Sequence, residues 1–227
     1  MTARSTLGDA MQRKRVAVLI SGRGSNMAAL IEAAKDKNYP AEIALVLSNR
    51  PDAAGLGIAR AAGIATEVVD HTVFGKDRAV FDGAMQAVLE AQGIDIVCLA
   101  GFMRLLTPAF VEHWRGRMIN IHPALLPAFK GLDTHKRAIA AGAKIHGATV
   151  HFVVPEMDAG PIIAQGAVAV HTDDTEAALA ARVLAVEHRI YPLALKLLAE
   201  GRIRIENGRC LIDGVAVPDS AAIVPGP

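Results

Sequence analysis

The chain has 227 residues, of which 52% are hydrophobic and 21% charged, a composition typical of a folded domain and unlike that of a disordered chain. Its 24 basic and 23 acidic residues leave a net charge of +1, which argues against a broad surface for nucleic acid or anionic membrane. Two distant cysteines, Cys98 and Cys210, exclude a disulfide framework and a zinc motif. The apolar run from Val16 to Ile20 is too short for a secretory signal or a membrane span. We therefore expect a cytoplasmic protein that binds any anionic ligand locally.

The first half of the chain alternates short β-branched runs with helical patterns, which is typical of βαβ units that build a parallel sheet. Strands are expected as apolar runs covered on both faces at residues 16–20, 42–48, 66–69 and 94–100. Helices are expected between them. The segment 76–92 shows this best, because Phe81, Met85, Val88 and Leu89 fall on one face of a helix.

The second half departs from this rhythm. A strand at 118–122 precedes a proline-bearing loop at 123–133, which can be neither regular helix nor central strand. Two longer strands, at 143–154 and 162–170, flank a tight loop with two prolines and a glycine.

The chain is expected to end in a long helix and a hairpin. The helix covers about 175–200, with Asp173 and Glu176 as its N-cap and cap partner. The dipeptide Asn207-Gly208 favours a hairpin turn between short strands. The fold class is therefore α/β: a Rossmann-like, mostly parallel sheet with helices on both faces, a long C-terminal helix and a small β-hairpin.

The loop 21–26 reads Ser-Gly-Arg-Gly-Ser-Asn and leads into an apolar helix near Met27. Backbone N–H groups and the helix dipole would converge there on an anion, although a tight βα turn also accounts for the glycines. The dinucleotide pattern fails because Met27 stands at its third small position, and no P-loop Gly-Lys-Ser/Thr follows. The economical hypothesis is one phosphate monoester held by Gly24, Ser25 and Asn26.

Asn120 and His122 share one face of the strand at 118–122, because strand side chains alternate with a period of two. Pro123 ends the strand, so both lie at its carboxyl end, where open α/β sheets place their ligand crevice. A core histidine satisfied by a neighbour accounts for His122 alone, but a buried amide beside it is costly without a use. Asp158 could return to the same edge in a parallel topology, although on its own it fits a loop-capping aspartate better.

The order of several motifs resembles the folate-dependent formyltransferases, and among them phosphoribosylglycinamide formyltransferase (glycinamide ribonucleotide transformylase) of purine synthesis. The resemblance extends over about 16–205 and rests on motifs at residues 21–26, 100–104, 120–127, 146–153, 158–160 and 187–192. It implies that Asn120, His122 and Asp158 are catalytic. Attack of an amine on a formyl carbon creates a negative oxygen, which Asn120 and protonated His122 would face as donors. Asp158 would keep His122 protonated and assist proton transfer to the leaving nitrogen.

The resemblance also implies the ligands, 10-formyltetrahydrofolate as co-substrate and glycinamide ribonucleotide as acceptor, with no metal. The acceptor would contact Gly24, Ser25, Asn26 and Glu187. The folate would lie along Arg78, Met103, Arg104, Leu105, Leu106, Asn120, Val154 and Asp158.

Some of these ligand residues also fit purely structural roles. The segment 103–106 could be a simple βα connection, and Arg78 a solvated helix charge. Glu187 could be a helix-face carboxylate that pairs with Arg182 or Arg189.

Four further positions complete the site hypothesis. His146 and His151 are five apart on a strand and point to opposite faces, so they form no metal pair, and we expect one structural and one near the site. Asp133 stands where many of these formyltransferases carry a histidine, and Leu184 where some have a polar contact.

The domain prediction follows the same division. One formyltransferase domain is expected at 15–213, with a phosphate-binding βαβ half at 15–115 and a catalytic, folate-binding half at 116–213. Residues 1–14 and 214–227 are expected to be a flexible N-terminal extension and a C-terminal tail.

Rival functions share part of the pattern. Methionyl-tRNA formyltransferase needs a basic RNA-binding domain, and we expect no nucleic-acid or membrane partner here. A formyltetrahydrofolate hydrolase would leave the phosphate loop without a purpose, and a non-catalytic folate- or nucleotide-binding module would not need all three polar residues. The protein is expected to be a monomer or homodimer.

Overall fold

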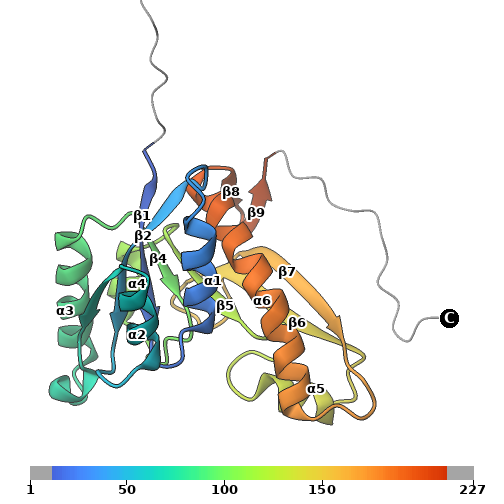
Figure 1. Ribbon diagram of the computed structural model, residues 1–227. Coiled ribbons are helices and arrows are strands. Elements are labelled where there is room, and N and C mark those ends of the chain that lie inside the picture. Colours follow the sequence, from blue (N-terminus) through green and yellow to red (C-terminus); the bar gives the residue numbers. More distant parts are fainter. Residues whose placement is uncertain (1–11, 214–227) are drawn as a thin grey trace, which may run out of the picture.

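Parallel strands form the first part of a seven-stranded sheet in the computed structural model, which describes residues 12–213 (Figure 1). They are β1 (Lys14–Ile20), β2 (Ala41–Ser48), β3 (Ala65–Val68), β4 (Ile96–Leu99) and β5 (Met118–His122), in the spatial order β3-β2-β1-β4-β5. The parallel half expected from the sequence pattern is confirmed. β3 differs from the expectation of a strand covered on both faces, because it lies at the sheet edge and is largely exposed.

Two antiparallel strands complete the sheet, β6 (Ile145–Phe152) and β7 (Ile162–Ala169). Because β6 runs against β5, its last residue pairs with Ile119, at the start of β5 and away from His122. The prediction that a parallel strand brings Asp158 back to the carboxyl edge is therefore wrong, because β6 is antiparallel to β5. The loop after β6 must itself turn back toward His122.

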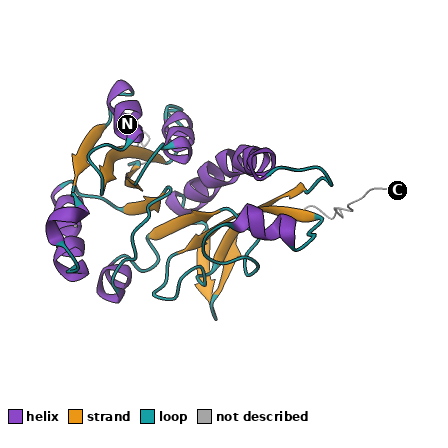
Figure 2. Cartoon of the chain, turned by 90° about the horizontal axis from the view of Figure 1, so that it is seen from below, coloured by secondary structure: helices purple, strands orange, loops and turns teal. Residues whose placement is uncertain are grey.

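Helices cover both faces, and each face has its own apolar core (Figure 2). One face carries α1 (Ser25–Ala34), α2 (Ala54–Ala61) and α6 (Glu176–Ala199), and α5 (Thr134–Ala140) packs against α6. The other carries α3 (Arg78–Ala91) and α4 (Pro108–His113), while the 3₁₀ turn η1 (His71–Phe74) joins β3 to α3. In β1, Val16 and Val18 belong to the first core and Ala17 and Leu19 to the second, which explains why its sequence is a continuous apolar run.

The start of α6 corrects one prediction. Thr175, not Asp173, is the N-cap, and its hydroxyl accepts a hydrogen bond from the N–H of Ala178 at 3.2 Å. The neighbouring Asp174 instead binds Arg182. The hairpin is confirmed: β8 (Ile203–Glu206) and β9 (Arg209–Ile212) are joined by Asn207 and Gly208, both with positive φ.

The described residues begin two positions before the first strand. β1 begins at Lys14, one residue before the predicted domain, and the Arg13 side chain donates to the carbonyls of Ala34 and Ala41. Residues 1–11 and 214–227, which fall in the predicted extensions, lie outside the described residues. Both predicted halves contribute strands to the same sheet. Among residues 12–213, no helix combines the length and apolarity that crossing a bilayer requires.

Candidate active site

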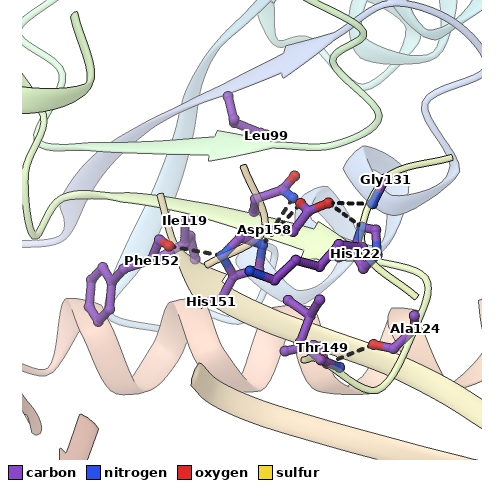
Figure 3. Close-up of polar contacts among 12 residues, drawn as sticks. Leu99, Ile119, His122, Ala124, Gly131, Thr149, His151, Phe152 and Asp158 are labelled. Atoms are coloured by element: carbon purple, nitrogen blue, oxygen red, sulfur yellow. Dashed lines mark hydrogen bonds and ion pairs between the residues drawn. The ribbon is translucent and has the colours of Figure 1, made fainter. Parts of the chain in front are cut away.

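His122 lies at the carboxyl end of β5, and its side chain is 6% exposed. Its Nε2 lies 3.0 Å from the carbonyl oxygen of Phe129, so Nε2 carries the hydrogen, since a carbonyl can only accept. Its Nδ1 lies 3.5 Å from Oδ2 of Asp158 (Figure 3). The imidazole is thus held between a neutral acceptor and a carboxylate.

Asp158 reaches this imidazole from the loop after β6. Its backbone has a φ of 51°, in the left-handed region that aspartate tolerates, and its side chain is 10% exposed. Oδ2 also accepts a hydrogen bond from the N–H of Gly131 at 2.8 Å, and Oδ1 lies 3.9 Å from Nε2 of His151. The carboxylate therefore joins its loop to the loop of Gly131 and faces the rings of His122 and His151, a different arrangement from a loop cap.

Asn120 is oriented by the strand beside it. It pairs with His151 across β5 and β6, and its Nδ2 lies 3.2 Å from Nε2 of that histidine. Nδ1 of His151 lies 2.8 Å from the Phe152 carbonyl, so Nδ1 carries the hydrogen and Nε2 accepts from the amide. Burial lowers the pKa of His151, which favours the neutral ring that this pattern requires. The amide keeps a second N–H hydrogen for a ligand.

A buried threonine fixes the loop that carries Phe129 and Gly131. The Thr149 hydroxyl donates to the Ala124 carbonyl at 2.7 Å and accepts from the N–H of Leu126 at 3.0 Å. These bonds tie the loop after β5 to β6. Thr149 and the position of the loop carbonyl were not identified from the sequence, because only the strand register reveals which residues face each other.

The two histidines of β6 separate as expected. His151 contacts the cluster, whereas His146 packs edge-on against His135 and Phe129. Within residues 12–213 neither ring nitrogen of His146 has a hydrogen-bond partner. No group of three or more histidine, cysteine, aspartate or glutamate side chains in the described chain is placed to hold a metal ion.

Acidification is expected to weaken the fold through His146. Its burial, with His135 beside it, lowers its pKa from 6.5 to about 4. Below pH 6.5 the unfolded chain binds a proton at this histidine, whereas the folded chain binds it only near pH 4. The free energy of unfolding therefore decreases as the pH is lowered. Between about pH 7 and about pH 5 this loss is roughly 2 kcal/mol. Denaturant unfolding should show that His146→Phe removes most of it.

The same substitution at exposed His171 is the control and should leave the pH dependence unchanged. Equal pH dependence in wild type and His146→Phe would contradict this assignment.

The glycine loop opens onto a polar cleft of about 390 Å³ at the carboxyl ends of β1, β2 and β4. Gly24 has a φ of 75° and precedes α1, and a Cβ there would lie 2.9 Å from the Gly55 backbone, so glycine is required. Ser25 and Asn26 form the first turn of α1. Arg23, Arg50 and Arg104 also line this cleft, which gives it a positive character.

Glu187 of α6 meets this loop. The carboxylate accepts a hydrogen bond from Nδ2 of Asn26 at 2.6 Å, and burial raises its pKa. Pairing with Arg182 does not occur, because Arg182 binds Asp174. The structure thus unites the residues expected to contact the acceptor.

The expected folate residues are only partly brought together. Val154 is half-buried in the loop of Asp158, Arg104 lines the cleft, and Leu106 packs on the core beside α3 and α4. Met103 and Leu105 are 65% and 63% exposed, so their side chains do not pack on the core.

Two details modify that expectation. The N–H of Met103 is engaged by the hydroxyl of Ser21 at 2.7 Å, so it is not free for a pterin edge. Arg78 is exposed at the start of α3 and does not line the cleft.

Comparison with known proteins decides the family. The sequence pattern described as formyl transferase matches residues 14–195. The chain belongs to the formyl transferase family.

Two similar proteins differ in length from each other. Phosphoribosylglycinamide formyltransferase of Escherichia coli (strain K12) is 44% identical over 203 residues, which cover 89% of this chain and 95% of that protein. The human trifunctional purine biosynthetic protein adenosine-3 is 51% identical over 199 residues, or 87% of this chain. The chain spans only 20% of the length of that relative.

A solved formyl transferase structure shares the fold. Glycinamide ribonucleotide transformylase 1 from Symbiobacterium toebii has a TM-score of 0.85 and 46% sequence identity, covering 88% of this chain and 94% of that one. The α/β fold expected from the sequence and the resemblance to formyltransferases are confirmed.

Proposed function

We propose that this formyl transferase moves the formyl group of 10-formyltetrahydrofolate to the amine of glycinamide ribonucleotide, a step of purine synthesis. The observation that carries the proposal is the meeting of Asn120, His122 and Asp158 at the carboxyl edge, beside a loop suited to a phosphate. The relatives named phosphoribosylglycinamide formyltransferase support the same acceptor.

The proposed chemistry needs no covalent intermediate on the protein. The acceptor amine forms a bond to the formyl carbon, whose oxygen becomes negative. Asn120 Nδ2 and a protonated His122 donate to that oxygen, and the nearby Asp158 carboxylate stabilises the imidazolium. Collapse breaks the bond between the formyl carbon and N10 of the folate. Asp158 assists transfer of the proton from the amine to N10.

One contact must change for this role. The N–H of His122 donates to the Phe129 carbonyl in this structure, so the formyl oxygen would take the place of that carbonyl. Both the Phe129 carbonyl and the formyl oxygen can accept the N–H of His122. The formyl oxygen forms the stronger hydrogen bond once it becomes negatively charged.

The acceptor end is proposed to bind at α1 and α6. The phosphate would accept from the backbone N–H groups at Gly24, Ser25 and Asn26, which point out of the helix start. Within the described chain, Oδ1 of Asn26 is buried without a partner, and with Glu187 it offers acceptors to the glycinamide N–H groups.

Ser25→Asp is expected to raise the KM for glycinamide ribonucleotide at least tenfold, on the order of 1.4 kcal/mol of lost binding, because a carboxylate would repel the phosphate. Steady-state kinetics with varied acceptor measure this. The matched control is Ala177→Asp, which adds the same charge to the exposed first turn of α6. An unchanged KM in Ser25→Asp would sink the phosphate assignment.

The decisive test of the function offers three acceptors to the purified protein with 10-formyltetrahydrofolate: glycinamide ribonucleotide, unformylated initiator methionyl-tRNA, or water alone. Loss of the formyl donor is followed. Turnover that depends on glycinamide ribonucleotide is expected, whereas equal loss with water would indicate a formyltetrahydrofolate hydrolase, and no loss would indicate a binding module.

The remaining expectations belong to the same proposal. The enzyme would work in the cytoplasm as a monomer or homodimer, with no metal. Residues 15–213 would form one catalytic domain.

A further inference from the structure

Ser21, the last residue before the glycine loop, is buried and connects three loops of the sheet edge. Its hydroxyl accepts from the N–H of Met103 at 2.7 Å and donates to Oδ1 of Asn49 at 2.6 Å. Its backbone N–H donates to the Gly101 carbonyl at 3.2 Å. The loops after β1, β2 and β4 are therefore joined through one side chain.

Asn49 is itself fixed by a fourth element. Its side chain and backbone together are 2% exposed, and its carbonyl accepts from Nδ1 of His71 at 2.8 Å, at the start of η1. A buried amide has lost its hydrogen bonds to water, and leaving it without a partner would destabilise the fold. The bond to Ser21 replaces one of those lost bonds.

The segment after Gly101 depends on these bonds. Met103 and Leu105 point largely into solvent, and Gly101 has a φ of 73°. Backbone contacts to Ser21 therefore hold the start of a segment whose own side chains pack little. The residues that directly follow Ser21 form the phosphate loop.

We infer that Ser21 is a positioning residue that couples the two substrate sites, by holding the loop proposed for the folate against the loop proposed for the acceptor phosphate. The inference rests on the proposed function, because it takes the ligand of each loop from it. Loss of the hydroxyl leaves the N–H of Met103 and Oδ1 of Asn49 without this partner. The two loops are then no longer held in fixed positions relative to each other.

The test measures Kd for glycinamide ribonucleotide and for tetrahydrofolate by calorimetry, with KM and kcat as a second readout, on Ser21→Ala. Both Kd and both KM are expected to rise about two- to tenfold, the range set by loss of one hydrogen bond, with kcat within about twofold. Asn49→Ala should show the same pattern, and Ser21→Thr, which keeps the hydroxyl, should restore both affinities.

Tyr39→Phe is the matched control. Tyr39 is also buried, but its hydroxyl donates to the carbonyl of Pro192 at 2.7 Å and contacts neither of the two loops. Its loss should leave both Kd unchanged even where it lowers Tm.

The inference is overturned if only one Kd changes in Ser21→Ala, if Tyr39→Phe raises both equally, or if Ser21→Thr binds as weakly as Ser21→Ala. Should Ser21→Ala not fold, Asn49→Ala decides by the same criteria. Binding of both ligands without formyl transfer would contradict the proposed function and leave the Kd comparison valid.

Discussion

Asn120→Ala is expected to lower kcat by about two to three powers of ten, the usual effect of removing one oxyanion donor. The amide is held by His151 with one N–H hydrogen left for the ligand, so its contribution is preorganised and no other group at that position replaces it. Because the interaction strengthens only as charge develops on oxygen, KM should change little. Steady-state kinetics at saturating substrates measure the loss.

Asn38→Ala is the matched control, since it removes an exposed asparagine amide far from the cluster and should leave kcat unchanged. A loss in Asn120→Ala below about fivefold, or roughly 1 kcal/mol of barrier, would count against the donor role.

Asp158→Asn is expected to lower kcat by about two to four powers of ten, because the carboxylate is proposed both to stabilise the His122 imidazolium and to accept the amine proton. The substitution keeps the shape, tolerates the same positive φ and can still accept from the N–H of Gly131. It therefore separates charge from structure.

The same loop supplies its own control. Glu156 is an exposed acid two positions earlier, 3.5 Å from Lys130, and Glu156→Gln should leave kcat within about twofold. If Asp158→Asn retained wild-type kcat, the carboxylate would have no part in catalysis.

Local sequence patterns predicted the strands and helices because each element carries its own signal. β5 coincides with the predicted residues 118–122, and its period of two placed Asn120 and His122 together. The hairpin turn followed from Asn207 and Gly208 alone. The start of α6 could not be predicted in this way, because two aspartates and a threonine all suit an N-cap. Thr175 takes that position in the structure, while Asp174 is bound by Arg182.

Contacts between distant residues could not be predicted from local patterns. The partner of Asn120 depends on the register of β5 and β6, and a shift by one residue would turn His151 to the other face. The direction of β6, which sets the path of Asp158, is not visible in its sequence, since apolar strands suit either pairing. The bond between Asn26 and Glu187 joins residues 161 apart, and no local pattern predicts it; the family resemblance indicates only that both residues contact the acceptor.

In the absence of a ligand, the carbonyl of Phe129 occupies the position next to His122 that the formyl oxygen is proposed to take. Without a ligand, the N–H of His122 already donates to a backbone carbonyl, so in the proposed reaction the formyl oxygen would replace one carbonyl acceptor by another. Such an exchange would be nearly neutral for a ground-state formyl group and would become favourable only when that oxygen gains negative charge. Under the proposed function, the loop after β5 would therefore favour the transition state over the bound reactant.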